Sequence, residues 1–179
     1  MTSPKLRIGD IGFAMDTDSW LSKAIAWFMQ SKWSHCFMVL DVTPNHVYLL
    51  ETSNYNVWIS RLYRYDSDMT KEYVVFRPDI PLADAKRFTY ATYEENIGKT
   101  YGYLQLISLG VRCLFKRFGI KISNFIRAGL VCCHVPLYGY RHSNIDGLAG
   151  IDPESIDTED LYQLISGSNR FRVVREKRL

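Results

Sequence analysis

His35 is the first residue along the chain whose type and surroundings could serve catalysis. It lies at the start of the apolar run SHCFMVLDV (34–42), and a second run, HVYLLET (46–52), follows the turn sequence Thr43-Pro44-Asn45. Two such runs separated by a short turn predict a β-hairpin. Because a histidine at the start of a buried strand is often structural, the facing strand decides what His35 could do.

The predicted hairpin brings a carboxylate within reach of this histidine. If the loop has three residues, Phe37 faces Glu51. His35 then faces Ser53, and Glu51 is its diagonal neighbour on the same face of the sheet. A carboxylate there can accept the Nδ1 proton, fix the tautomer and support an imidazolium, which is the orienting role in a hydrolase triad. An error of one residue in register would turn Glu51 to the other face.

Cys132 and Cys133 supply the candidate nucleophile, far downstream of His35. A cysteine becomes a nucleophile when a histidine or a helix N-terminus stabilises its thiolate. The run GLVCC can place a cysteine at the entrance of a helix, where backbone N–H groups also offer an oxyanion hole. The alternative is that both thiols are small buried side chains. Cys36 should point to the opposite face of its strand from His35, and Cys113 lies mid-helix, so both are predicted to be structural.

Other chemistries have less support in the sequence. His134 and His142 lie near the paired cysteines, but the spacings are not those of a structural zinc site, so no metal or other cofactor is expected. The G-x-S-x-G motif of serine hydrolases does not occur, and neither does a glycine-rich phosphate loop.

The composition favours one globular domain over residues 1–179. The chain is 47% hydrophobic and 23% charged, values typical of a protein with a buried core. A net charge of +3 does not require a nucleic-acid partner. Four cysteines are too few for a disulfide scaffold at this length, which predicts reduced thiols.

The sequence predicts neither a secretory signal nor a membrane span. The N-terminus lacks a basic start followed by an apolar run. The longest apolar stretch, Tyr103 to Phe118, is interrupted by basic residues and Gln105. We therefore expect synthesis in a cytoplasm, with delivery by another route if the substrate lies outside. The apolar and basic segment 103–121 leaves a membrane-surface protein as an alternative to a buried helix with a basic end.

Periodicity and turn signals predict the elements that position these residues. A strand is expected at 6–14, broken by the bend or bulge signal Gly9-Asp10, and further strands at 34–42, 46–52, 56–63, 72–77 and 171–177. Helices are expected from Trp20 to near Ser31 and at 81–95, 101–118 and 158–166, with a loop at 141–153. Segment 130–140 begins as an apolar run and turns helical, with Pro136 tolerated only near the first helical turn. One α+β domain is the economical prediction.

The order of these motifs resembles the circularly permuted NlpC-type papain-like hydrolases, often called YiiX-like. Their G-D-[IVL] strand and S-H strand are matched by IGDIGF and WSHCFMVL, and the carboxylate of the next strand by LLET. A Gly-x-x-Tyr-x-Tyr element is matched by GKTYGY, and the nucleophile pattern C-S-x-[LFV]-V by VCCHV. The late segment DPESIDTEDLYQL (152–164) is also typical. The resemblance spans about residues 8–165.

This resemblance implies a papain-like fold with a central antiparallel sheet or half-barrel packed against helices. It implies a triad of Cys132, His35 and Glu51. Cys133 stands where the family has a serine and is the alternative nucleophile.

The resemblance also implies a substrate cleft. The tyrosines of GKTYGY, Tyr101 and Tyr103, and the serine of the S-H pair, Ser34, are its expected members. Core packing at a helix start is the alternative role for the two tyrosines.

The implied activity is hydrolysis of an amide bond by a thiol enzyme, with peptide stems of peptidoglycan as substrate and lipid acyl groups or other amides as the runner-up. Because no signal peptide is predicted, a phage-encoded wall hydrolase carried in the virion is one hypothesis and a cytoplasmic amidase another. Cys133, His134 and Pro136 depart from the family pattern. These departures motivate a second class, an inactive papain-like module with a structural or binding role beside other virion proteins.

Overall fold

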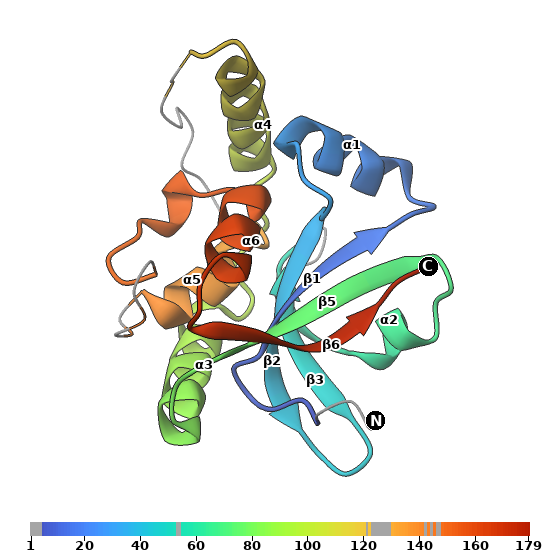
Figure 1. The fold of residues 1–179 in the computed structure, drawn as a ribbon, viewed down its shortest axis with the longest axis vertical. Helices are drawn as coiled ribbons and strands as arrows, with labels where there is room; N and C mark the ends of the chain where they lie inside the picture. Colours follow the sequence, from blue (N-terminus) through green and yellow to red (C-terminus); the bar gives the residue numbers. More distant parts are fainter. Residues whose placement is uncertain are drawn as a thin grey trace.

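The computed structural model describes residues 5–52, 55–120, 122, 130–141, 143, 145 and 148–179. They form an α+β fold around a six-stranded antiparallel sheet of order β4-β3-β2-β1-β5-β6 (Figure 1). In chain order the strands are β1 (Ile11–Asp16), β2 (His35–Val42), β3 (Val47–Thr52), β4 (Val57–Arg61), β5 (Lys71–Pro78) and β6 (Phe171–Lys177). The predicted fold class, α+β with a central antiparallel sheet packed against helices, is confirmed.

The described helices follow β1, β4 and β5 along the chain. They are α1 (Trp20–Met29), α2 (Tyr63–Asp66), α3 (Leu82–Asn96), α4 (Tyr103–Arg117), α5 (His134–Tyr140) and α6 (Thr158–Ser166), with a 3₁₀ turn, η1 (Pro153–Ser155). Helices α3 to α6 gather on one side of the sheet, whereas α2 lies at its other side (Figure 1). None of the described helices is long and apolar enough to span a bilayer.

Two elements differ from the sequence prediction. The break predicted at Gly9-Asp10 is confirmed, since Gly9 has a φ of +86° that favours glycine, but β1 begins only after it, at Ile11 and not at residue 6. The short helix α2 was not predicted, since four residues are too few to show a helical period.

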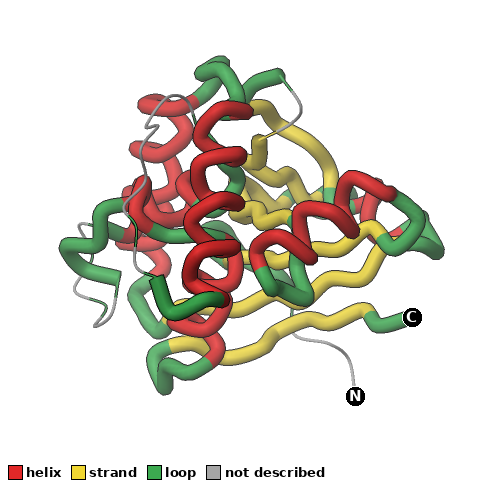
Figure 2. Tube along the Cα trace, turned by 90° about the horizontal axis from the view of Figure 1, so that it is seen from above, coloured by secondary structure: helices red, strands yellow, loops and turns green. Residues whose placement is uncertain are grey.

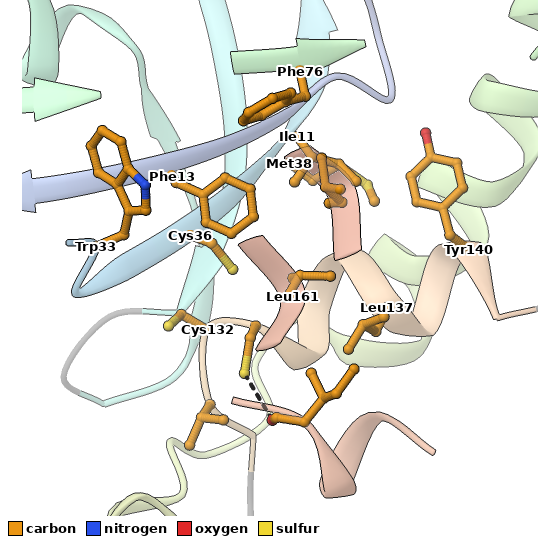
Figure 3. Close-up of a cluster of buried hydrophobic side chains, with 14 of the residues drawn as sticks. Ile11, Phe13, Trp33, Cys36, Met38, Phe76, Cys132, Leu137, Tyr140 and Leu161 are labelled. Atoms are coloured by element: carbon orange, nitrogen blue, oxygen red, sulfur yellow. Dashed lines mark hydrogen bonds between the residues drawn. The ribbon is translucent and has the colours of Figure 1, made fainter. Parts of the chain in front are cut away.

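The sheet separates two apolar clusters. On β2, Cys36 and Met38 face the larger cluster, which also holds Cys132 and lies against the helices (Figure 3). Phe37 and Val39 face the smaller cluster on the opposite side. This alternation is the two-residue period of a strand buried on both faces.

The β2–β3 hairpin has the predicted register at its far end and a different turn. Phe37 faces Glu51 as expected. At the turn, however, Val42 pairs with Val47 and not with His46, so the loop is four residues long. A β-bulge between Val39 and Asp41 absorbs the extra residue and restores the predicted pairing. The expected partner of His35, Ser53, lies outside the described residues.

The segment before α5 is held beside the start of α4. Tyr101 and Leu130 form a parallel bridge, and the N–H of Gly102 donates to the carbonyl of Leu130 at 2.9 Å. α5 then begins at His134, two residues after Cys132. Pro136 is the third residue of this helix, where no intrahelical N–H bond is lost, so the predicted tolerance is confirmed.

α6 is fixed to α4 by a charged cluster. Asp157 caps α6 in a capping box with Asp160. Arg112 of α4 binds both carboxylates at 2.9 Å. Asp157 is nearly buried, so this pairing keeps its charge compensated. The cluster places Thr158, the first residue of α6, against the cysteine pair.

Candidate active site

His35 and Glu51 meet across neighbouring strands. Nε2 of His35 lies 2.7 Å from Oε2 of Glu51, and the Glu51 side chain is 1% exposed, whereas that of His35 is 24% exposed. The sequence placed the two residues diagonally on one face, which is the arrangement seen. The histidine therefore stands between a buried carboxylate and a solvent-accessible space.

The ring nitrogen that meets the carboxylate is not the expected one. The sequence prediction had Nδ1 of His35 facing Glu51, but Nε2 does so. The diagonal position requires the imidazole to reach along the sheet with the nitrogen farther from its backbone. Nδ1 is consequently left for a partner on the other side of the ring.

Two further residues hold the carboxylate. The hydroxyl of Tyr65 donates to Oε2 of Glu51 at 2.5 Å, and Nη1 of Arg64 donates to Oε1 at 3.1 Å. Burial raises the pKa of Glu51, but the hydrogen bond and the charge of His35, with smaller contributions that include the Tyr65 hydroxyl, outweigh it and bring the pKa to about 2. Glu51 is therefore a buried, ionised carboxylate with three charged or polar partners. Tyr65 and Arg64 come from α2, which the sequence did not reveal.

Cys132 lies on the short loop before α5 and is 5% exposed. Its Sγ is 3.7 Å from Oγ1 of Thr158. The neighbouring Cys36 lowers the pKa of Cys132, burial raises it and His35 lowers it, and the balance lies well below the usual value. Burial lowers the pKa of His35, yet Cys132 and Glu51 together raise it to about 10. These shifts favour a thiolate–imidazolium pair.

Cys133 has a different environment. Its thiol donates to the carbonyl of Ile156 at 3.4 Å, and it is 1% exposed. Burial and the nearby Cys132 raise the pKa of Cys133 well above its usual value. Of the two adjacent cysteines, Cys132 is the one whose pKa His35 lowers.

Cys36 is a buried core side chain, as the predicted structural role requires. It does point to the opposite face of β2 from His35, but the structure brings it beside Cys132 in the core (Figure 3). Burial and the side chain of Cys132 raise the pKa of Cys36, so it stays a thiol. The strand alternation was right, and what it could not show is that Cys132 lies beside Cys36. Cys113 is buried in α4 as expected.

A cavity of about 280 Å³ opens over His35 and Glu51. Ser34 and Tyr101 line it, as the cleft prediction requires. Tyr103 does not line this cavity. It is 50% exposed and packs edge-to-face on Tyr101, with 4.8 Å between the ring centroids.

One buried residue near the cysteine segment was not anticipated. Gln105, in the first turn of α4, is 0% exposed, and neither atom of its carboxamide has a partner among the described residues. Buried polar groups without a partner are rare in folded proteins. Only the structure reveals this, because a glutamine in an amphipathic helix is unremarkable in sequence.

The metal alternative rested on His134 and His142 near the cysteines. His142 lies outside the described residues. His134 is buried, its Nδ1 accepts from the N–H of Val131 at 3.5 Å, and burial lowers its pKa to about 4. Within the part of the chain that the structure describes, no group of three or more His, Cys, Asp or Glu side chains could hold a metal ion.

Comparison with known proteins supports the fold. The chain is similar to the crystal structure of metalloprotein yiiX from Escherichia coli O157:H7 (DUF1105), with a TM-score of 0.52, 16% sequence identity and coverage of 96% of this chain and 97% of that chain. No protein-family model and no curated protein sequence matches this chain. The α+β architecture is thus consistent with a papain-like, YiiX-like fold, at an identity that shows the fold alone.

Proposed function

We propose that the protein is a cysteine hydrolase that cleaves an amide bond through Cys132, His35 and Glu51. The observation that carries the proposal is the row of three linked ionisable groups at this site. Glu51 is ionised and hydrogen-bonded to Nε2 of His35, and the imidazole is paired with a thiol of lowered pKa. Carboxylate, imidazole and thiolate in this order are what a thiol hydrolase needs.

In this mechanism the Cys132 thiolate attacks the substrate carbonyl carbon and forms the C–S bond. The negative charge moves to the carbonyl oxygen, which backbone N–H groups before α5 stabilise. The protonated Nδ1 of His35 gives its proton to the leaving nitrogen as the C–N bond breaks. His35 then takes a proton from water, whose oxygen displaces Cys132 from the acyl-enzyme. Glu51 keeps the imidazole oriented throughout and supports its positive charge.

The substrate we favour is a peptide with carboxylates, as in the peptide stems of peptidoglycan. Arg64 and Lys71 both line the cavity over His35, beside the carboxylates of Asp16 and Glu51. The two cationic side chains offer partners for a substrate carboxylate near the scissile bond. Such an enzyme could act as a wall hydrolase carried in a phage virion, and the alternative is a cytoplasmic amidase.

The deciding experiment compares thiol labelling in four forms of the protein. At neutral pH a small iodoacetamide probe should label the wild type and Cys133→Ser fast and at one site. Cys132→Ser should lose this fast phase, and His35→Ala should slow it at least tenfold. Hydrolysis of purified peptidoglycan stem peptides should follow the same order.

Equal labelling of wild type and His35→Ala would show that the imidazole does not activate the thiol. Fast labelling without turnover of any amide substrate would instead favour the second class, a papain-like module with a binding or structural role.

A further inference from the structure

The helices α1 and α4 expose an unusual amount of apolar surface. Besides Tyr103, these helices and the residue directly after α4 carry six large side chains that are between 44% and 77% exposed: Trp20, Trp27, Phe28, Leu104, Ile107 and Phe118. We call this set the α1–α4 face. The two helices lie side by side on the outside of the molecule, and no described helix or strand covers them (Figure 2). Apolar patches of this kind mark a surface that binds something.

The α1–α4 face is also grooved. A cavity of about 370 Å³ runs between the helices, and its lining side chains are apolar, among them Trp20, Phe28 and Ile107. Gly110 of α4 lines this groove opposite Phe28, and a Cβ there would make only ordinary contact with the Phe28 side chain at 3.8 Å. The surface therefore combines projecting aromatic rings with an apolar trough.

The charge of the two helices distinguishes between possible partners. Neither helix carries an acidic residue, whereas together they carry Lys23, Arg112, Lys116 and Arg117. Arg112 and Lys116 bind the carboxylates of Asp157 and Asp160 at the start of α6. Lys23 is exposed between Trp20 and Trp27 in the sequence of α1 and makes no ion pair with another described residue. Two copies of this face would bring lysine towards lysine, whereas an anionic surface would be attracted.

We propose that the α1–α4 face binds the surface of a lipid bilayer that contains anionic lipids. Tryptophan prefers the boundary between headgroups and acyl chains, and leucine, isoleucine and phenylalanine insert just below it. Lysine adjacent to them pairs with anionic headgroups. A helix face with these three components lies in the interface without spanning the bilayer.

Binding to a bilayer would also bring the cavity over His35 close to the membrane surface. The groove and the cavity over His35 share two lining residues, Leu21 and Ile25. A bilayer against the α1–α4 face would therefore stand at the entrance of that cavity. The proposed binding itself does not depend on catalysis by Cys132.

Vesicle flotation with the full chain tests the proposal. We expect the wild type to float with vesicles of phosphatidylcholine and phosphatidylglycerol, and to float much less with phosphatidylcholine alone or at high salt. Trp20→Ser combined with Leu104→Ser should reduce the bound fraction at least tenfold. Both side chains are exposed and neither lines the cavity over His35, so folding and thiol labelling should be unchanged. Met69→Ser, which removes a 77% exposed side chain elsewhere, is the matched control and should float like the wild type.

Three results would overturn the proposal. One is failure of the folded wild type to float with anionic vesicles at low salt. Another is equal flotation of the double variant and Met69→Ser. The third is a wild-type dimer in light scattering that becomes a monomer in the double variant, with no flotation of either, which would assign the face to a second copy of the chain.

Discussion

Nε2 of His35 lies 2.7 Å from Oε2 of Glu51, and the same oxygen accepts a second hydrogen bond from the hydroxyl of Tyr65. This shared oxygen fixes the direction of the imidazole plane, because Tyr65 itself packs against Phe37 with 5.3 Å between the ring centroids. A buried carboxylate whose lone pairs are satisfied holds its charge and its position. Glu51 and Tyr65 thus hold the imidazole of His35 in a fixed orientation before substrate binds.

The reactivity of Cys132 should depend on pH in two steps. Its pKa is lowered, so labelling by an alkylating probe should already be fast below neutral pH and level through neutrality, whereas an ordinary cysteine becomes faster towards pH 9. The pKa of His35 is raised to about 10, so amide hydrolysis should fall as the pH rises through 10 and the leaving group loses its acid. Rates measured from pH 4 to 11 check both steps. A labelling curve with one rise near pH 9 would contradict the ion pair.

Folding stability should depend on the ionisation of Glu51 at low pH and on that of His35 at high pH. The folded pKa of Glu51 is about 2, below its ordinary value, so its contribution is full above pH 4.5 and is lost as the pH falls towards 2. The folded pKa of His35 is about 10, above its ordinary value, so its contribution is full below pH 6.5 and is lost as the pH rises towards 10. Urea midpoints of wild type and Glu51→Gln should therefore converge at low pH. A constant gap from pH 2 to 7 would count against an ionised Glu51.

Tyr65→Phe tests the role of the shared oxygen. Removal of the hydroxyl takes one donor from Glu51 and leaves the ring packing in place, so the pKa of Glu51 should rise and the imidazole should lose part of its orientation. We expect kcat to fall several-fold with KM nearly unchanged, because Tyr65 acts through Glu51. Tyr63→Phe, on the same helix but 72% exposed, is the control and should leave kcat unchanged. A change in KM alone would mean that Tyr65 contacts substrate directly.

Cys36→Ala tests the unexpected neighbour of the nucleophile. The hydrogen bond from Cys36 lowers the pKa of Cys132, so its removal should shift the acidic limb of the labelling curve to higher pH. Cys113→Ala, a buried cysteine near Asp157 and not near His35, should leave this limb in place. If the two variants behave alike, the Cys36 thiol does not stabilise the Cys132 thiolate.

The histidine and the carboxylate were predictable because strand period and hairpin pairing are local properties of the sequence. The pairing of Phe37 with Glu51 was right although the loop is four residues long, since the β-bulge after Val39 compensates for the longer turn. Neither the bulge nor the longer turn has a clear signature in SHCFMVLDVTPNHVYLLET. The correct register therefore depended on two deviations that cancel.

The rest of the site depends on contacts between distant segments. Tyr65 reaches Glu51 only because α2 folds back under the sheet, and Cys36 meets Cys132 only because the loop before α5 ends beside β2. The family resemblance favoured Cys132 over Cys133 as the nucleophile, but no pattern in VCCHV distinguishes the surroundings of the two thiols. The carbonyl of Ile156, which binds the Cys133 thiol, is supplied by a turn far along the chain.

Gly12→Ala tests the packing that supports His35 from the neighbouring strand. A Cβ at Gly12 on β1 would lie 2.1 Å from the Phe37 ring, which is fully buried and cannot move away. We expect a loss of about 1–3 kcal/mol in the free energy of unfolding, the usual cost of overpacking a core. Gly110→Ala is the matched control, because its Cβ would make only ordinary contacts at 3.8 Å and alanine favours a helix. That variant should be equal to or more stable than the wild type by urea denaturation, and equal destabilisation by both would show that the Phe37 ring does not set the limit at Gly12.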